Sequence, residues 1–333
     1  MSTLSRVRTG LAVATATAAM AACGGGSGGS TSEGTPTRTE VVTHNSVGGG
    51  SDVFTRQIIK VMADNDIIDT QWPVRNVPAG DSIGAMSYMI ERDGDPNVIS
   101  QVTPTWIATP MTVEDAAVSM DQLTPITMLA EEPQVVVASA DSEYDTLTDF
   151  IDDAKANPDQ LVQSGGSSTA NDALTRLVLQ EQEDASWKFL SFEETGSRIT
   201  ALLRGDADIM MGAASDFSEQ VRAGELKAIA VIGSEGLDIF PDATTTDEQG
   251  IEGADLPVQF RAIMGAPNMP DEAVQQYQDD FAALLETEDW DAIAEENGLV
   301  TSGSTGEEFN SYLEEQTTIV GDLLEEQGLR KDQ

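Results

Sequence analysis

Residues 40–63 read EVVTHNSVGGGSDVFTRQIIKVMA, and this stretch decides the fold. The β-branched and apolar residues at 40–45 predict a strand, the three glycines at 48–50 predict a tight turn, and residues 52–63 predict a helix. A strand, a turn and a helix in this order are typical of α/β proteins, whose strands are mainly parallel.

The same alternation continues along the rest of the chain. Further strands are expected at residues 72–76, 97–101, 134–138, 160–163, 207–211, 228–232 and 261–266. Further helices are expected at residues 147–156, 170–182, 197–203, 217–223, 272–285 and 307–327. With 333 residues, 40% of them hydrophobic, the chain is long enough to bury the core of one large domain or of two.

The charge of the chain excludes several classes of partner. It has 17 Lys and Arg against 58 Asp and Glu, a formal charge of −41. Nucleic acids and anionic membrane surfaces bind basic patches, so neither is expected as a partner. Such an excess of carboxylates destabilises a protein by self-repulsion in dilute buffer, and molar salt screens that repulsion. The composition therefore predicts a halophilic source.

A single cysteine, Cys23, and a single histidine, His44, limit the chemistry further. They exclude an intrachain disulfide and metal centres rich in Cys or His, and no metal or cofactor is expected. The enzyme alternative is a serine hydrolase, but the G-x-S-x-G motif is absent and His44 is the sole imidazole base. We therefore expect a binding protein and not an enzyme.

Residues 1–22 resemble an export signal. A basic start precedes an uncharged run at residues 11–22, which is too short to span a bilayer. The run ends in MAAC at residues 20–23, which resembles the lipobox of lipoproteins, and residues 23–39 form a Gly/Ser-rich tether. The sequence therefore predicts a lipoprotein signal peptide, lipidation of Cys23, and an extracytoplasmic body at the outer face of the cell membrane.

The first glycine turn is a candidate anion site. Glycines let the backbone approach a ligand closely, and the start of the next helix presents unpaired N–H groups at the positive end of its dipole. The turn lacks the Lys of a phosphate-binding loop and the spacing of a dinucleotide fingerprint, so nucleotides are not expected. Ser51 or Asp52 either caps the helix or contacts the ligand. The candidate contacts are Gly48, Gly49, Gly50, Ser51 and Asp52.

Two later turns offer similar donors. QSGGSSTAN at residues 163–171 again lies between an expected strand and an expected helix. ETGSR at residues 194–198 opens a further helix, and its arginine either pairs with a ligand carboxylate or forms a surface ion pair. Two such turns facing each other would bind a molecule with a carboxylate at each end. The candidate contacts here are Gly165, Gly166, Ser167, Ser168, Gly196, Ser197 and Arg198.

Some aromatic and sulfur-containing side chains are candidates for packing in the core, and the aromatic ones are also candidates for contact with a ligand. A ligand contact and ordinary packing both fit four residues: His44, Trp106, Phe192 and Phe260. Met210 and Met211 are expected to fill the core, because Met adapts to irregular gaps.

A series of short motifs follows one order along nearly the whole chain after the tether. The series comprises VGGGSD at 47–52, RNVPAGDSIGA at 75–85, ANP at 156–158, GGSS at 165–168, LRGDAD at 203–208, RAGELKAIAV at 222–231, FPDAT at 240–244, EQG at 248–250 and GAPNMP at 265–270. Each motif alone is weak, but the ordered set is specific. The series resembles the tripartite tricarboxylate transporter receptors, extracytoplasmic solute-binding proteins that are also called Bug proteins.

The resemblance implies a two-domain, type II periplasmic-binding-protein fold, in which each domain is a mainly parallel sheet flanked by helices. It implies domain 1 at residues 40–138 and 259–333 and domain 2 at residues 139–258. It also implies that a small carboxylate binds between the domains, and it adds Asp81 and Ser82 to the candidate contacts. A membrane permease would receive the ligand from a monomeric receptor. The alternative is a sensor that presents the carboxylate to a membrane kinase.

Overall fold

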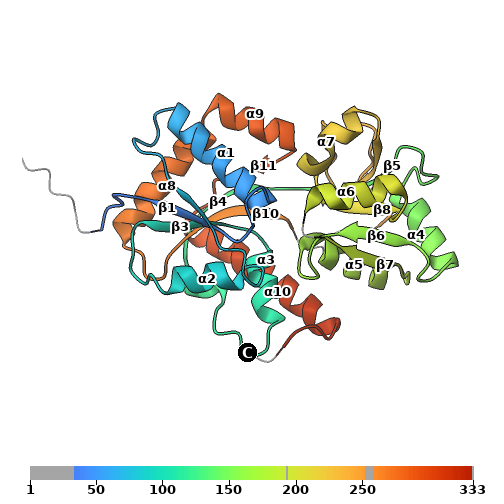
Figure 1. Ribbon diagram of the computed structural model, residues 1–333, viewed down its shortest axis with the longest axis horizontal. Helices are drawn as coiled ribbons and strands as arrows, with labels where there is room; N and C mark the ends of the chain where they lie inside the picture. Colours follow the sequence, from blue (N-terminus) through green and yellow to red (C-terminus); the bar gives the residue numbers. More distant parts are fainter. Residues whose placement is uncertain (1–33, 193, 252–257, 332–333) are drawn as a thin grey trace, which may run out of the picture. The chain divides into compact units, whose positions relative to one another are not determined.

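The computed structural model describes residues 34–192, 194–251 and 258–331, which contain two β-sheets flanked by helices (Figure 1). The predicted signal peptide, Cys23 and the first part of the tether lie outside the described residues. Within the described part of the chain, none of the helices has the length and apolar character needed to cross a membrane.

The first sheet has the strand order β11-β4-β10-β3-β1-β2. Its strands are β1 (Glu40–Thr43), β2 (Val74–Asn76), β3 (Val98–Val102), β4 (Thr124–Glu131), β10 (Phe260–Gly265) and β11 (Val300–Thr301). β1 is parallel to β2 and β3, whereas β10 is antiparallel to β3 and β4, and β11 is antiparallel to β4. The first sheet is therefore mixed.

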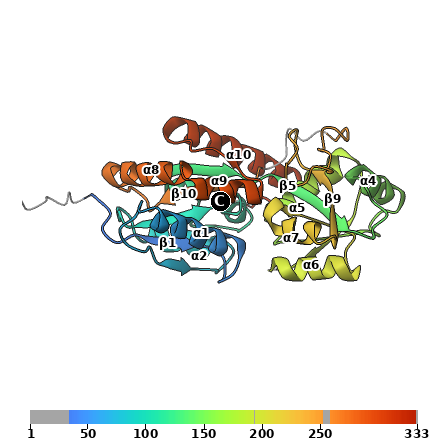
Figure 2. The same cartoon turned by 90° about the horizontal axis from the view of Figure 1, so that it is seen from above.

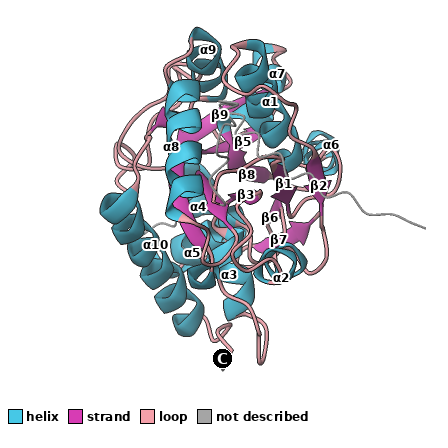
Figure 3. Cartoon of the chain, turned by 90° about the vertical axis from the view of Figure 1, so that its left-hand side faces the viewer, coloured by secondary structure: helices cyan, strands magenta, loops and turns pink. Residues whose placement is uncertain are grey.

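Helices cover both faces of the first sheet (Figure 3). They are α1 (Gly50–Asp64), α2 (Ile83–Ile90), α3 (Thr105–Met111), α8 (Asp271–Leu285), α9 (Glu288–Asn297) and α10 (Gly306–Glu326), with a short 3₁₀ helix, η1 (Met120–Gln122), before β4. Neighbouring residues of a strand point to opposite faces. Accordingly, Val41 packs with α1, α8 and α9, and Val42 packs with α2, α3 and α10.

The second sheet has the strand order β7-β6-β8-β5-β9. Its strands are β5 (Gln134–Ser139), β6 (Val162–Gly165), β7 (Lys188–Ser191), β8 (Ile209–Ala213) and β9 (Leu226–Val231). Its helices are α4 (Leu147–Ala156), α5 (Asn171–Gln182), α6 (Thr195–Arg204) and α7 (Ala214–Arg222). Val136 packs with α4 and α5, and Val137 packs with α6 and α7, so helices again cover both faces (Figure 2). Met210 and Met211 are fully buried in these cores, as predicted.

The predicted α/β fold is confirmed, but both sheets are mixed and not mainly parallel. The antiparallel pairs involve the strands that flank the two connections between the sheets, β4 and β10 in the first sheet and β5 in the second. The predicted domain 1 included residues 134–138, yet β5 pairs with β8 and β9, so the chain enters the second sheet before Gln134. It returns between β9 and β10. The division into two domains stays a prediction.

Candidate ligand-binding site

A polar cavity of about 670 Å³ is lined by residues from both sheets and their helices. This volume lies in the range of small-molecule sites. The cavity brings together the turn after β1, the turn after β6 and the start of α6, which are far apart in the sequence. Eight of the predicted contacts line it: Gly48, Gly49, Gly50, Ser51, Asp81, Ser167, Gly196 and Arg198.

The first glycine turn leads directly into α1, which begins at Gly50. Gly48 has a φ of 86°, in the left-handed region that favours glycine. The side chain of Asn45 accepts the N–H of Ser51 at 2.8 Å. Within the described part of the chain, the N–H of Gly50 has no acceptor, because the first amides of a helix lack intrahelical partners. It therefore remains a hydrogen-bond donor at the positive end of the helix dipole.

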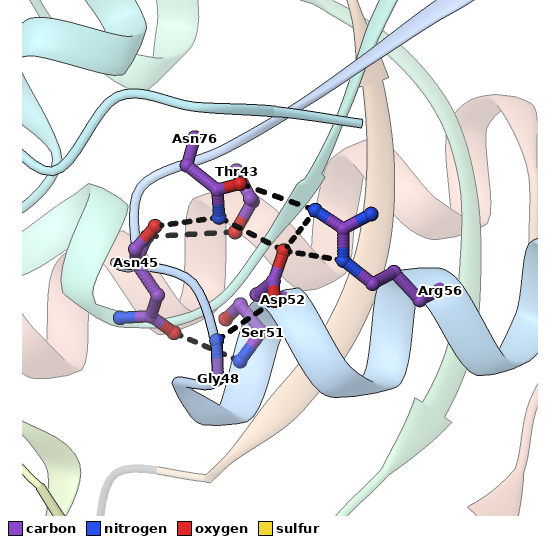
Figure 4. Close-up of polar contacts among 7 residues, drawn as sticks. All are labelled: Thr43, Asn45, Gly48, Ser51, Asp52, Arg56 and Asn76. Atoms are coloured by element: carbon purple, nitrogen blue, oxygen red, sulfur yellow. Dashed lines mark hydrogen bonds and ion pairs between the residues drawn. The ribbon is translucent and has the colours of Figure 1, made fainter. Parts of the chain in front are cut away.

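Asp52 does not line the cavity, and its carboxylate holds the turn in place. It accepts the N–H of Gly48, the Nε of Arg56 and the side-chain amide of Asn76, each at 2.9 Å (Figure 4). Burial acts to raise the pKa of Asp52, but the hydrogen bonds from Arg56, Gly48 and Asn76, with the charge of Arg56, outweigh it and lower the pKa. The expected ligand contact is thus corrected to a structural role.

Asn45 and Asn76 complete this network. Asn76 donates to the backbone oxygen of Asn45 at 2.9 Å, and Arg56 donates to the side-chain oxygen of Asn76 at 3.2 Å (Figure 4). The parallel pairing of β1 with β2 sets Thr43 opposite Asn76, which brings the two asparagines together. The sequence does contain a signal for this network. Each of the two asparagines lies at the carboxyl end of a parallel strand, which is the edge where ligands bind in α/β sheets.

The turn after β6 is built around a second buried carboxylate. Oδ2 of Asp172, which is 5% exposed, accepts the N–H of Gly166 at 2.8 Å. A Cβ atom on Gly165 would lie 2.2 Å from this oxygen and 2.4 Å from the ring of Phe189, so packing alone requires a glycine there. Burial raises the pKa of Asp172, although the charge of Arg198 and backbone N–H groups act in the opposite direction.

Five further predicted contacts do not line the cavity: Ser82, Gly165, Gly166, Ser168 and Ser197. Ser82 is fully buried, and its hydroxyl donates to the backbone oxygen of Thr105 at 3.2 Å. The two glycines are buried beside Asp172, and both serines are exposed to solvent. Because these groups are covered or face outward, we remove them from the candidate set.

Arg261 lines the cavity, although sequence reasoning does not include it. It lies on β10, its side chain is 10% exposed, and its Nη2 is 2.6 Å from Oε2 of Glu132. Its guanidinium also lies over the ring of Phe54, 5.2 Å from the centroid. The sequence feature that could have revealed Arg261 is its position in the otherwise apolar strand FRAIMG, because a buried charge requires a partner.

Asp216 is a second charged residue that sequence reasoning does not include. It is half-buried, it lines the cavity, and it is the third residue of α7. Burial, together with the charge of Glu132, raises the pKa of Asp216 to about 6, although Arg198 and Arg261 oppose this shift. No local pattern marks Asp216, because its charged neighbours come from distant segments.

His44 both packs against the core and lines the cavity. Its Nδ1 accepts the indole N–H of Trp106 at 2.9 Å, so the ring proton lies on Nε2. Burial and the charge of Arg261 lower the pKa of His44 to about 4, which keeps the ring neutral near pH 7. Phe192 lines the cavity, whereas Trp106 and Phe260 are fully buried.

The fold matches solved binding-protein structures over most of the chain. A structure described as a periplasmic transporter has a TM-score of 0.79 at 19% identity, covering 88% of this chain and 98% of that chain. MatC from Rhodopseudomonas palustris with bound malate has a TM-score of 0.72 at 19% identity, covering 86% and 98%. R. palustris Rpa4515 with adipate has a TM-score of 0.80 at 16% identity, covering 89% and 98%. The fold is thus that of a periplasmic binding protein.

Sequence comparison defines the family. The family described as Tripartite tricarboxylate transporter family receptor matches residues 55–329. A UPF0065 protein of Bordetella pertussis is 22% identical over 284 residues, which cover 85% of this chain and 87% of that protein. The chain therefore belongs to the tripartite tricarboxylate transporter receptor family, as the motif series indicates. It is a transporter binding protein and not an enzyme.

Proposed function

We propose that this receptor is an extracytoplasmic, lipid-anchored protein that captures a small di- or tricarboxylate and delivers it to membrane permease subunits of a tripartite tricarboxylate transporter. Family membership supports the transport role. The relatives MatC and Rpa4515 were solved with malate and adipate, respectively, which supports the ligand class. The observation that carries the proposal is one cavity lined both by the start of α1 and by Arg198.

The cavity offers donors for a carboxylate on two sides. One side presents the N–H of Gly50 at the start of α1, and the other presents Arg198 on α6 and the hydroxyl of Ser167. Hydrogen bonds to an ionised carboxylate are stronger than neutral ones, and an arginine binds a carboxylate with a matching planar geometry. A molecule with a carboxylate at each end would therefore contact both sides.

We further propose that the two sheets belong to two domains that close on the ligand. An open form would expose each side separately, and the ligand would add contacts that exist only when the sides converge. The site residues in this proposal are the eight predicted contacts that line the cavity, together with His44, Asp216 and Arg261.

A thermal-shift panel tests the ligand class. In molar KCl, which screens the charge of −41, malate, succinate, adipate and citrate are expected to raise the melting temperature. Sugars, amines and nucleotides are expected to leave it unchanged. Stabilisation by polyols, with no response to any of the acids, would contradict the proposal.

The same assay across KCl concentrations tests the halophilic prediction, which requires the melting temperature to rise with salt.

The lipid anchor has a separate test. Cys23→Ala removes the atom that would carry the lipid, so the exported protein should move from the membrane fraction to the soluble fraction. The measurement is fractionation followed by a salt and carbonate wash. If the variant still sediments with washed membranes, Cys23 is not the anchor.

A further inference from the structure

Two arginines and three acids that are buried or half-buried lie in the lining of the cavity or next to it, so these acids outnumber the cations. The cations are Arg198 on α6 and Arg261 on β10. The acids are Asp172 on α5, Asp216 on α7 and Glu132 between β4 and β5, and the charges of Asp172 and Glu132 both act on Asp216. Three acids in a site for an anion require an explanation, because like charges repel.

Two of the acids already have a cation. Arg261 and Glu132 form an ion pair at 2.6 Å in which both side chains are almost fully buried. Arg198 acts on Asp172 through its charge, and Asp172 also accepts the N–H of Gly166. Each arginine therefore already has one acid as a charged neighbour before any ligand binds.

Asp216 is the acid without a cation of its own. Among the described residues, its carboxylate has neither a hydrogen-bond donor nor an ion-pair partner. Glu132 and Asp172 repel its charge, and burial adds to their effect, whereas Arg198 and Arg261 attract it. Asp216 lines the cavity together with Asp172, Arg198 and Arg261.

The other titratable groups at the cavity leave this balance unchanged near neutral pH. His44, at the end of β1, is neutral, because its pKa is about 4. Asp81, after β2, and Glu194, before α6, also line the cavity but are exposed to solvent, which screens their charges.

We propose that Asp216 contacts one carboxylate of the ligand as a protonated acid, so that capture of a dicarboxylate takes up one proton from solvent. This inference rests on the proposed carboxylate-binding function. Two carboxylates that share a site hold one proton between them, because both cannot ionise at short range. A buffer acid in the solvent supplies the proton. Its bond to that proton breaks as an O–H bond forms on Asp216, and this O–H donates a charge-assisted hydrogen bond to an oxygen of the ligand carboxylate.

Titration calorimetry with malate and adipate at pH 6.5 and pH 8.5, in molar KCl, tests the inference. At the higher pH Asp216 of the free protein is ionised, and binding must first add a proton. We therefore expect Kd to rise by about ten-fold or more between the two pH values. The measured enthalpy should also change with the ionisation enthalpy of the buffer, by the amount that corresponds to uptake of one proton.

Three variants identify the residue responsible. Asp216→Asn keeps the shape and a donor but does not ionise, so it should bind at pH 8.5 about as tightly as the unmodified protein binds at pH 6.5. Asp216→Ala removes the donor and should bind weakly at both pH values. Glu219→Gln removes an exposed charge from the same helix and should keep the original pH profile. Melting temperatures without ligand show that each variant is folded.

The outcomes separate this inference from the proposed function. Dicarboxylate binding with the same affinity at both pH values would overturn the inference and leave the proposed function intact. Preferential binding of an amino dicarboxylate that Asp216→Asn abolishes would also overturn it, because Asp216 would then act as a charged partner of an ammonium group. Failure of every dicarboxylate to bind at either pH would overturn both.

Discussion

The two glycine turns of this receptor share one design, yet their environments differ. Each follows a strand and precedes a helix, and each places a buried aspartate that accepts a glycine N–H. The distances are 2.9 Å from Gly48 to Asp52 and 2.8 Å from Gly166 to Asp172. In the first turn, Arg56 and Asn76 also donate to the carboxylate, and the pKa of Asp52 is lowered. In the second, burial prevails, and the pKa of Asp172 is raised.

This difference extends to what each turn presents to the cavity. The first turn exposes its backbone there, through the three glycines at 48–50. The second presents mainly side chains, because Gly165 and Gly166 are buried beside Asp172. The same local pattern therefore presents backbone to the cavity in one place and mainly side chains in the other, and the two turns are not equivalent.

The largest expected effect is on ligand affinity when bulk is added to the first turn. Gly50 lines the cavity, and a Cβ atom there would meet nothing within 4 Å, so Gly50→Val should not disturb the free protein. The side chain would block the amide of the helix start. We expect the affinity for malate or adipate to fall by about 100-fold or more. The ligand would lose one charge-assisted hydrogen bond, and the added side chain would also block its approach to the amide.

Matched variants sharpen this prediction. Gly196 also lines the cavity in open space, on the side of the second sheet, so Gly196→Val should weaken binding less than Gly50→Val. Gly236 is equally open but lies outside the cavity, and Gly236→Val should bind normally. Calorimetric titration measures all three. Full binding by a folded Gly50→Val protein would show that the ligand lies elsewhere.

The second prediction concerns stability, and it contrasts the two aspartates. Asp52→Asn should lower the free energy of unfolding at pH 7 by about 1–3 kcal/mol, because Arg56 and Asn76 lose an acceptor. Asp172→Asn should leave stability unchanged or slightly raised, because it removes a buried charge whose pKa is already raised. Urea unfolding without ligand measures both. Equal losses of unfolding free energy in the two variants would contradict this contrast between the two aspartates.

The pH dependence of these variants should have opposite signs. The lowered pKa of Asp52 stabilises the fold above its ordinary value of 3.8, and this contribution is lost as the pH falls through the lowered pKa. The deficit of Asp52→Asn should therefore begin to shrink below about pH 4 and disappear only below the lowered pKa. The raised pKa of Asp172 costs stability as the pH rises above 3.8, so any gain from Asp172→Asn should appear toward neutral pH.

The smallest expected effect separates two neighbouring serines. Ser167 lines the cavity, and Ser168 is exposed outside it. Losing one hydroxyl donor costs about 0.5–1.5 kcal/mol, so Ser167→Ala should weaken ligand binding by roughly 2- to 10-fold. Ser168→Ala should bind within roughly two-fold of the unmodified protein. A larger effect at Ser168 than at Ser167 would show that the turn is oriented differently when the ligand is bound.

Strand and helix alternation predicts most of the fold, and the elements that it does not predict have specific causes. β4 contains Pro125, which disfavours a central strand but is accommodated at a register shift opposite Met264. β7 is an exposed edge strand without apolar alternation. α3 contains Pro110, and the strongly acidic α9 contributes a short apolar stripe that includes Trp290.

The candidate site is only partly predictable for a different reason. Glycine turns are local patterns, and eight of the predicted contacts indeed line the cavity. Arg261 and Asp216 acquire their environment from segments that are distant in the sequence, and no local spacing reveals it. Sequence likewise does not distinguish Asp52 from a ligand contact, because its partner Asn76 lies 24 residues away.

The central claim is that one ligand carboxylate binds at the start of α1, in the cavity shared by both sheets. A crystal structure of the protein with malate or adipate tests it most directly. We expect a carboxylate oxygen at about 3 Å from the amide nitrogen of Gly50, with the second carboxylate beside Arg198 and Asp216. A ligand bound without contact to Gly50, or in the shallow acidic depression that includes Asp271 and Asp279 on α8, would contradict the account.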